Sequence, residues 1–275
     1  MTKIITRTGT VLADSAMNLY NKKKNKKIIV SSDYWDGRDN DFEELKSVIY
    51  YKASMHTDEH IIPENTPISD QGNLGSCVAN SWCDMLEILQ GLRGDNIVQL
   101  SRLFLYWAAR DLTGLQSVDI GTYNRAAAHQ LRKVGVVAEK WYPYDVKKVY
   151  DAPELDLYTM AARNRIDSFY RIFSYGDQKV NDVDYAIRAN HPVTISTVVN
   201  KDFIKYRGSG HVFPFPTSWE GRHAMIVVGV RVRNGKSEFL LRNSWSKYWG
   251  DNGHAWVDES YIRSPETQDI WVGTI

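Results

Sequence analysis

The spacing of apolar residues changes from helical to strand-like along this chain of 275 residues, and this change limits the fold more than any other feature. Between about residues 77 and 190, apolar side chains recur every three or four positions. The helices expected from this spacing cover residues 77–90, 101–110, 123–133 and 177–190. The strands expected from β-branched runs cover residues 193–199, 224–232, 238–242 and 254–257, with a hairpin turn at Asn234-Gly235. A helical part followed by a β part predicts an α+β protein with two lobes.

The composition is that of a globular protein with a sizeable core. Hydrophobic residues make up 43% of the chain, charged residues make up 24%, and the net charge is +1. No apolar run approaches the roughly eighteen residues of a membrane-spanning helix, and the N-terminus lacks the apolar segment of a secretory signal. We therefore expect no membrane partner.

Only two cysteines, Cys77 and Cys83, are present, and both fall on the expected helix 77–90. Because they are six residues apart on one helix, their side chains point in different directions and cannot form a disulfide. A chain without disulfides is typical of a reducing compartment, and we expect a cytoplasmic location. The sequence also lacks zinc-type Cys/His spacing, a P-loop and a dinucleotide-binding motif, so neither a metal nor a cofactor is expected.

Residues 1–60 are polar and weakly patterned, and we interpret them as an N-terminal arm or short pro-segment, with one short helix near residues 42–51. Residues 1–27 carry a net charge of +6, and residues 28–60 carry a net charge of −5. The lysine-rich run at residues 22–27 is either a solvated linker or a surface that docks the protein onto a larger assembly. A nucleic-acid partner is not expected, because no aromatic residues accompany the run and residues 61–275 carry no net charge.

Cys77 has the sequence context of a nucleophile. It follows a turn-rich loop and begins a helix, where unpaired backbone N–H groups and the helix dipole stabilise a thiolate. The alternative is a buried structural cysteine, and Cys83, in mid-helix, fits that alternative well. A thiolate nucleophile also requires a histidine beside it and a third group that orients the imidazole ring.

His223 is the strongest candidate for that histidine, because it begins an apolar strand that would hold its side chain rigidly. Its competitor among the seven histidines is His211, in a glycine-rich loop. Asn243 ends a later strand, and its amide oxygen can accept a hydrogen bond from the ring. Trp245 and Trp249 follow, and their indoles would exclude water from that contact. The same residues are also compatible with a hairpin whose tryptophans only anchor the core.

Three motifs in order resemble those of the papain-like cysteine peptidases, over residues 61–275. They are Gln71-Gly72-x-x-Gly75-Ser76-Cys77-x-Ala79, then His223-Ala224, then Asn243-Ser244-Trp245-x-x-x-Trp249-Gly250-x-Asn252-Gly253. Cys77 precedes His223 by 146 residues and Asn243 by 166 residues. The first interval lies within the roughly 130–150 residues that separate these groups in that family, and the second is slightly longer.

The resemblance implies a papain-like α+β fold with the active site in a cleft between two lobes. The helical lobe would cover about residues 77–190 and the antiparallel β lobe about residues 191–275. The implied activity is that of a cysteine endopeptidase with a polypeptide substrate. In this interpretation Cys77 is the nucleophile, His223 is the acid and base, and Asn243 orients the ring.

Further roles follow from the same resemblance. Gln71 and the backbone N–H of Cys77 would form the oxyanion hole. Trp245 and Trp249 would be supporting residues, with Trp245 shielding the contact between Asn243 and His223. Gly121 would pair its backbone with the substrate.

The sequence also departs from the family pattern in one informative place. Leu74 stands where the family usually has a cysteine, which removes a disulfide partner and fits a reducing compartment, as in bacterial or phage relatives. A phage-encoded protein of this kind could also be virion-associated. Two other functions stay open: a peptidoglycan-type amidase or endopeptidase, and a non-catalytic assembly or binding module built on a peptidase fold.

Overall fold

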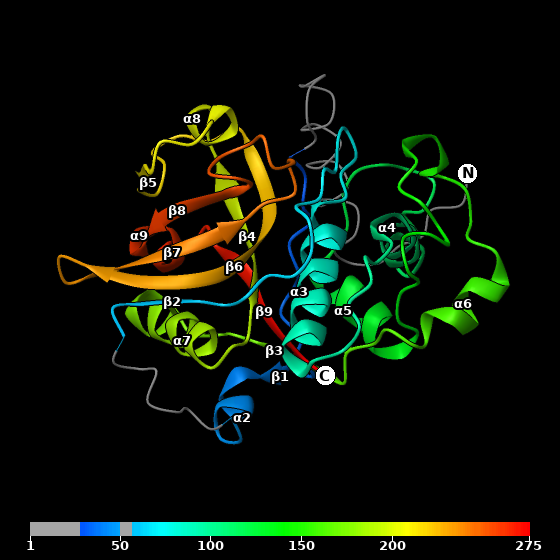
Figure 1. Ribbon diagram of the computed structural model, residues 1–275, viewed down its shortest axis with the longest axis horizontal. Coiled ribbons are helices and arrows are strands. Elements are labelled where there is room, and N and C mark those ends of the chain that lie inside the picture. Colours follow the sequence, from blue (N-terminus) through cyan, green and yellow to red (C-terminus); the bar gives the residue numbers. More distant parts are fainter. Residues whose placement is uncertain (1–27, 50–56) are drawn as a thin grey trace.

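The structure is a computed structural model and describes residues 28–49 and 57–275. Its helices are α2 (Phe42–Lys46), α3 (Cys77–Arg93), α4 (Arg102–Asp111), α5 (Asn124–Lys133), α6 (Leu155–Ala161), α7 (Gly176–Arg188), α8 (Lys201–Lys205) and α9 (Glu259–Arg263), with one 3₁₀ turn at Val146–Lys148. The lysine-rich run at residues 22–27 and the end of the helix expected at 42–51 lie outside the described residues. Figure 1 shows α3 to α6 on one side of the molecule and the sheet with α7 to α9 on the other.

The helical side is built around α3. Every residue of this helix from Cys77 to Gln90 is buried, because the helix contacts α4, α5 and the sheet. It ends at Gly94, whose φ of +87° is the left-handed conformation that glycine adopts without strain. Ser101 caps α4 by accepting a hydrogen bond of 3.1 Å from the Phe104 backbone N–H. The three helices expected between residues 77 and 133 are therefore present.

The β side is one mixed sheet. Its strands are β1 (Asn40–Asp41), β2 (Glu59–Ile61), β3 (Ser168–Arg171), β4 (Val193–Val199), β5 (Val212–Phe213), β6 (Gly221–Arg233), β7 (Lys236–Arg242), β8 (His254–Asp258) and β9 (Gln268–Thr274). The order is β1-β3-β9-β4-β6-β7-β8-β5, and β2 pairs with β6. Of these pairings, β1 with β3 and β5 with β8 are parallel, and the others are antiparallel. The expected hairpin is present, with positive φ at both Asn234 and Gly235.

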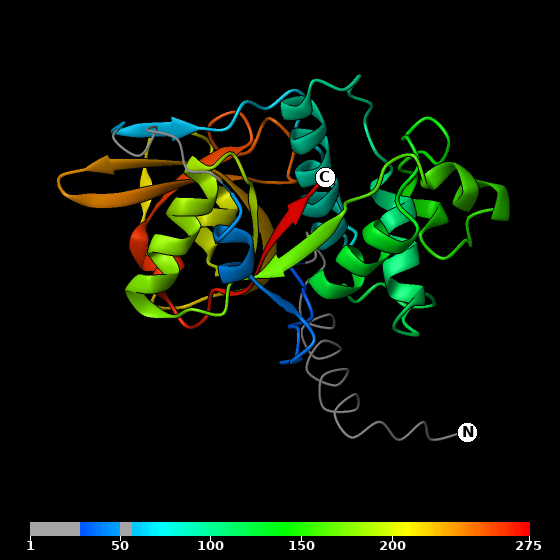
Figure 2. The same cartoon turned by 90° about the horizontal axis from the view of Figure 1, so that it is seen from below.

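The division between the two sides differs from the expected boundary near residue 190. Helix α7 packs mainly against α9, β6, β2 and β4, and Figure 2 shows it beside the sheet. Strand β3, which also precedes residue 190, pairs with β9 inside the sheet. The reason is that α7 buries an apolar face, which includes Val183 and Ile187, and the sheet offers the matching apolar surface.

The described part of the N-terminal region packs on the body of the protein. Strand β1 pairs in parallel with β3, and the buried Phe42 of α2 meets Tyr185 of α7 with ring centroids 6.5 Å apart. Lys46 also forms an ion pair of 2.8 Å with Asp182 of α7. Residues 33–49, which we name the anchor segment, are thus part of the folded unit. Within the described ranges, no helix combines the length and hydropathy needed to cross a membrane.

Candidate active site

Cys77 is the first residue of α3, and its side chain is fully buried between α3 and β6. The backbone N–H of Ala224, the second residue of the His223-Ala224 motif, is near enough to Cys77 to lower the pKa of its thiol. The second cysteine, Cys83, is also a free thiol and is enclosed in the core. The fold therefore brings the start of α3 to the strand that carries His223, although 146 residues separate them.

His223 and Asn243 lie side by side on the paired strands β6 and β7. The distance from His223 Nε2 to Asn243 Oδ1 is 2.7 Å. The Trp245 indole stacks on the imidazole, with centroids 4.4 Å apart and planes 21° apart. Trp249 meets Trp245 edge-on at 5.4 Å, and both indoles are almost completely buried. The competing His211 is instead exposed and packs on Phe213 of β5.

Gln71 is fully buried in the loop before α3 and is held by two neighbouring segments. Its Nε2 donates to the Leu74 carbonyl at 2.9 Å, and its Oε1 accepts from Ser244 Oγ at 2.6 Å. The Gln71 backbone N–H also donates to the Ser244 carbonyl at 2.9 Å. Sequence reasoning did not assign a role to Ser244, although its place between Asn243 and Trp245 was a usable signal.

Gly121 lies on the other wall of the site, with a φ of +89°. Its backbone N–H donates to the Tyr106 hydroxyl at 3.2 Å, and that hydroxyl donates to Asp119 at 2.6 Å. Asp119 also accepts from the Gly75 backbone N–H at 2.8 Å. This network joins the Gly121 loop to the loop that precedes Cys77.

Residues 28–31, which we name the covering segment, run between the Gly121 loop and the start of β6 at Gly221. The Ile29 carbonyl oxygen lies 3.7 Å from Cys77 Sγ and accepts a hydrogen bond from the thiol. A Cβ on Gly121 would lie 2.6 Å from that same oxygen, and a Cβ on Gly221 would lie 2.6 Å from the Ile28 oxygen. The Ser31 backbone N–H donates to the Thr122 carbonyl at 3.3 Å. Only glycine at these two wall positions leaves room for the backbone of the covering segment.

Burial of the site affects the pKa of the Cys77 thiol. Burial raises the pKa of the Cys77 thiol to about 11, although the Ala224 and Val78 backbone N–H groups act in the opposite direction. At neutral pH the sulfur is therefore a thiol and not a thiolate. The position of Cys77 at a helix N-terminus does not outweigh the loss of solvent around it.

The anchor segment begins directly after the covering segment, at a buried charged cluster. Asp33 accepts from the Arg125 backbone N–H at 3.1 Å and from Trp271 Nε1 at 3.0 Å. Burial and repulsion from Asp269 raise the pKa of Asp33, and burial raises that of Asp269 as well. Asp39 forms an ion pair with the Arg125 guanidinium. The covering segment is thus covalently attached to a firmly packed neighbour.

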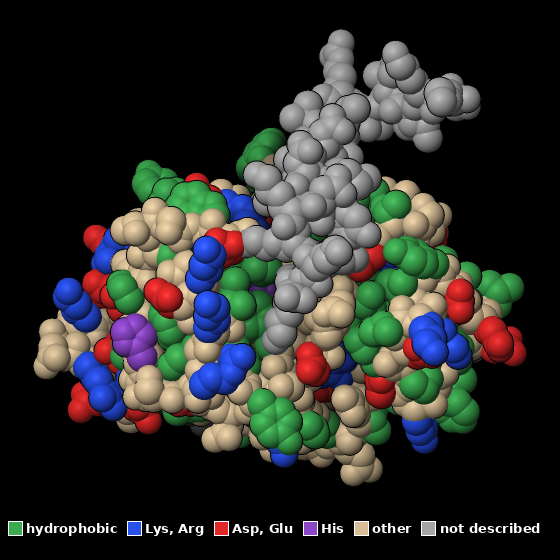
Figure 3. All heavy atoms as spheres, turned by 90° about the horizontal axis from the view of Figure 1, so that it is seen from above, with side chains coloured by type: hydrophobic (Ala, Val, Ile, Leu, Met, Phe, Trp, Pro, Cys, Tyr) green, Lys and Arg blue, Asp and Glu red, His purple; other side chains and the backbone are tan. Residues whose placement is uncertain are grey.

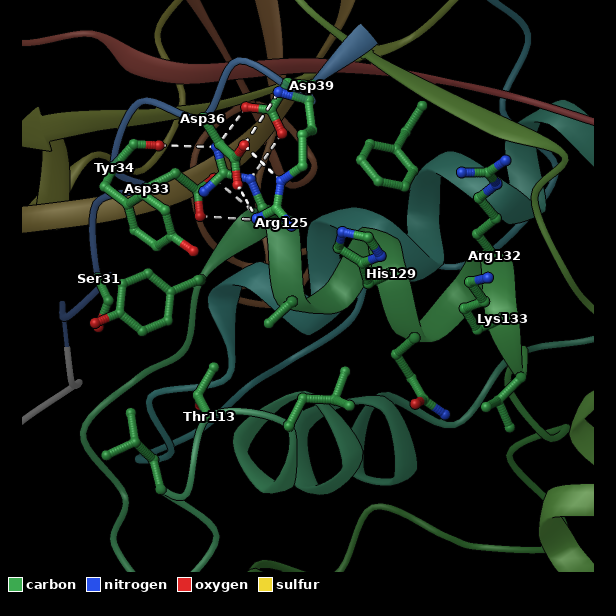
Figure 4. Close-up of a pocket in the computed structure, with 18 of the residues that line it drawn as sticks. Ser31, Asp33, Tyr34, Asp36, Asp39, Thr113, Arg125, His129, Arg132 and Lys133 are labelled. Carbon is green, nitrogen blue, oxygen red and sulfur yellow. Dashed lines mark hydrogen bonds and ion pairs between the residues drawn. The ribbon is translucent and has the colours of Figure 1, made fainter. Parts of the chain in front are cut away.

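A cavity of about 780 Å³ lies beside this cluster, between residues 31–40 and α5. Figure 4 shows Arg125 bonded to the anchor segment at one end of the cavity and His129 facing its interior. Cys77, His223 and Asn243 are not among its lining residues, so it is separate from the candidate active site. No group of three or more His, Cys, Asp or Glu side chains in the described ranges is placed to hold a metal ion. In Figure 3, basic and acidic side chains alternate over the visible surface.

Comparison with known proteins places this geometry in a family. The family model for "Papain family cysteine protease" matches residues 54–266. The chain therefore belongs to the papain family and is a cysteine protease, a hydrolase. An uncharacterised peptidase C1-like protein of Acanthamoeba polyphaga mimivirus is 29% identical over 77% of this chain and 70% of its own length. Cysteine proteinase 3 of Dictyostelium discoideum is 27% identical over 74% of this chain and 58% of its own length.

Solved structures agree with the α+β papain fold. Xylellain, a cysteine protease from Xylella fastidiosa, superposes with a TM-score of 0.77 at 24% identity and covers 92% of this chain and 98% of its own. Bromelain from Ananas comosus superposes with a TM-score of 0.63 at 20% identity and covers 80% of this chain and 99% of its own. At these identities the likeness is one of fold. Because the relatives come from viral, amoebal, plant and bacterial sources, they do not assign a phage or bacterial origin to this chain.

Proposed function

We propose that this protein is an endopeptidase that cleaves polypeptides through a thioester on Cys77, with His223 and Asn243 completing the catalytic group. The observation that carries the proposal is the contact of 2.7 Å between His223 and Asn243 on the strand pair β6 and β7, because β6 packs against α3, the helix that begins at Cys77. An asparagine oxygen at that distance fixes the ring without adding charge, and the stacked Trp245 keeps water from the contact.

The chemistry then follows two steps. His223 takes the proton of the Cys77 thiol, the sulfur attacks the carbonyl carbon of the scissile bond, the C–N bond breaks, and His223 transfers that proton to the leaving amine. A water molecule, deprotonated by His223, next attacks the thioester, which releases a carboxylate and restores the Cys77 sulfur. The oxyanion of each step would be held by the Cys77 backbone N–H and the Gln71 amide. Loss of one such donor typically costs about 100–1000-fold in rate.

We further propose that the described form is latent. The Ile29 carbonyl presents its oxygen, and not its carbon, to the sulfur at 3.7 Å, so the segment occupies the site without being positioned for attack. The protein would become active when residues 28–31 leave the cleft and solvent restores a lower pKa to Cys77. In this proposal, a partner or assembly binds the lysine-rich run directly before Ile28 and thereby draws residues 28–31 out of the cleft.

The test is labelling with an epoxysuccinate inhibitor, followed by peptide mapping. Stoichiometric modification of Cys77 is expected, and peptide cleavage should be lost in Cys77→Ala but retained in the matched control Cys83→Ala. Modification of Cys83 with Cys77 untouched would contradict the proposal. In the Gln71→Ala variant, a cleavage rate within twofold of the original would remove Gln71 from the oxyanion hole. Assays against both a peptide library and peptidoglycan separate an endopeptidase from an amidase.

A further inference from the structure

Arg242, the last residue of β7, and the two residues that follow it each contact a different segment near Cys77. Asn243 contacts His223 at 2.7 Å, and Ser244 contacts Gln71 at 2.6 Å. The preceding residue, Arg242, reaches in another direction, to Asp84 on α3. We propose that Arg242 is a positioning residue, which through Asp84 fixes Asn243 relative to the helix that carries Cys77. This inference rests on the proposed function of the same site.

The buried Arg242 side chain contacts three separate segments of the chain. Its side chain is 1% exposed, and its Nε lies 3.1 Å from Asp84 Oδ2. Its Nη2 donates to the Pro67 carbonyl at 2.8 Å, and its Nη1 is paired with Glu64. Asp84 lies seven residues after Cys77 on α3, about two helical turns along the same face. The planar fork of one arginine therefore connects β7, α3 and the chain leading to Gln71.

A second buried arginine, Arg102, extends this network of ion pairs. Arg102 of α4 lies 2.6 Å from the other oxygen of Asp84 and 2.9 Å from Glu87 Oε2. Glu87 in turn accepts from the Leu100 backbone N–H at 2.7 Å. On the opposite side of the network, Glu64 contacts His254 of β8 at 2.9 Å. An unpaired charge is costly in the protein interior, and a shift or rotation of α3 relative to β7 would separate these pairs. The network therefore restrains α3 against β7.

Stability alone does not require such a network. Replacing a buried ion pair by apolar side chains of similar volume is often neutral or stabilising, whereas removing one partner alone is strongly destabilising. The charges at Arg242 and Asp84 instead provide a directional connection that apolar packing lacks. A misplacement of about 1 Å at a catalytic contact can cost about 100-fold in rate. The network therefore acts on the distance between Asn243, His223 and Cys77.

The experiment compares full-length variants after titration of active Cys77 sites, so that misfolded molecules are not counted. Arg242→Lys keeps the charge but loses the fork, and the double variant Asp84→Leu, Arg242→Met removes the pair while keeping the volume apolar. We expect both to lower kcat by about 10–100-fold with KM changed by less than about threefold. The matched control is Arg231→Met, which breaks the 2.6 Å pair with Glu238 at the other end of the same strands and should leave kcat unchanged.

A second measurement does not depend on peptide cleavage. The pH dependence of Cys77 alkylation by iodoacetamide, read by peptide mapping, reports how well His223 stabilises the thiolate. In both Arg242 variants its midpoint should rise by at least about half a pH unit, and in Arg231→Met it should not move. A double variant that folds and matches the original in kcat and in alkylation profile would overturn the inference. If alkylation shifts as expected but no peptide is cleaved by the original protein, the positioning role holds and the endopeptidase proposal fails.

Discussion

Removal of the covering segment is the perturbation that most directly tests how this site is controlled. Deletion of residues 1–31 takes away Ile28, Ile29 and Val30, all less than 8% exposed, and leaves the anchor segment in place. Deletion of residues 1–27 is the matched control, because it keeps the covering segment. A third variant that lacks residues 1–49 also removes the anchor segment and with it the Asp39 partner of Arg125.

The magnitude of the effect follows from two opposing contributions. Burial of three aliphatic side chains stabilises the covered state by about 5–9 kcal/mol. Ordering four residues costs about 4–8 kcal/mol of conformational entropy. The two nearly cancel and leave about 1 kcal/mol, which is a factor of about five in the equilibrium between covered and open forms. The covering segment is therefore expected to be a weak and reversible inhibitor.

Two assays measure the change, the second-order rate of Cys77 labelling by an epoxysuccinate and kcat/KM on a small peptide. Both should rise by about five- to tenfold when residues 1–31 are deleted, compared with deletion of residues 1–27. The variant that lacks residues 1–49 should instead lose several kcal/mol of stability, since it strips a buried arginine of its partner and uncovers the surface under Phe42. Labelling rates within twofold of each other in the first two variants would refute the reasoning.

Three further predictions concern single side chains. Ser244→Ala removes the hydroxyl that donates to Gln71. Since one hydrogen bond contributes about 1 kcal/mol, kcat should fall about fivefold with little change in KM. An unchanged kcat would mean that the other contacts of Gln71 are enough to hold it. Asp33 has a pKa raised above its ordinary 3.8 by burial and by Asp269, so its contribution to stability is full below that value and is lost as the pH rises toward neutrality; Asp269→Asn should flatten this dependence in thermal unfolding scans, and an unaltered slope counts against the repulsion. Gly121→Ala places a Cβ 2.6 Å from a covering-segment oxygen at a φ of +89°, so it should both speed epoxysuccinate labelling of the covered protein and lower its melting temperature, and slower labelling contradicts this.

The elements with strong periodicity could be predicted from the sequence. The expected strand at residues 193–199 coincides with β4, and the helix expected at 123–133 begins one residue before α5. Strand β9 was not predicted, although it pairs with β3 and β4 near the middle of the sheet. Its run contains Asp269, Gly273 and Thr274, and this polar composition hides a strand whose partners are distant in sequence.

The residues of the candidate site could be predicted from the sequence, but the covering of Cys77 by another segment could not. The residues proposed as nucleophile, histidine and amide could be chosen because each stands near the end of an element that holds it rigidly. That residues 28–31 lie across Cys77 could not be predicted, because three aliphatic residues after a polar run have no periodicity to interpret.

The sequence by itself determined which chemistry is available: one cysteine at a helix start, one histidine at a strand start, and one amide followed by tryptophans, all in the order of a known family. Only the tertiary structure decided whether that chemistry is exposed. Burial raises the pKa of the Cys77 thiol, and the Ile29 carbonyl oxygen of the covering segment lies 3.7 Å from the sulfur. The tertiary structure also decided that Arg242, remote from Asp84 by 158 residues, joins the two halves of the site. Solvent access and long-range charge pairing depend on how distant segments meet, and local sequence patterns do not contain that information.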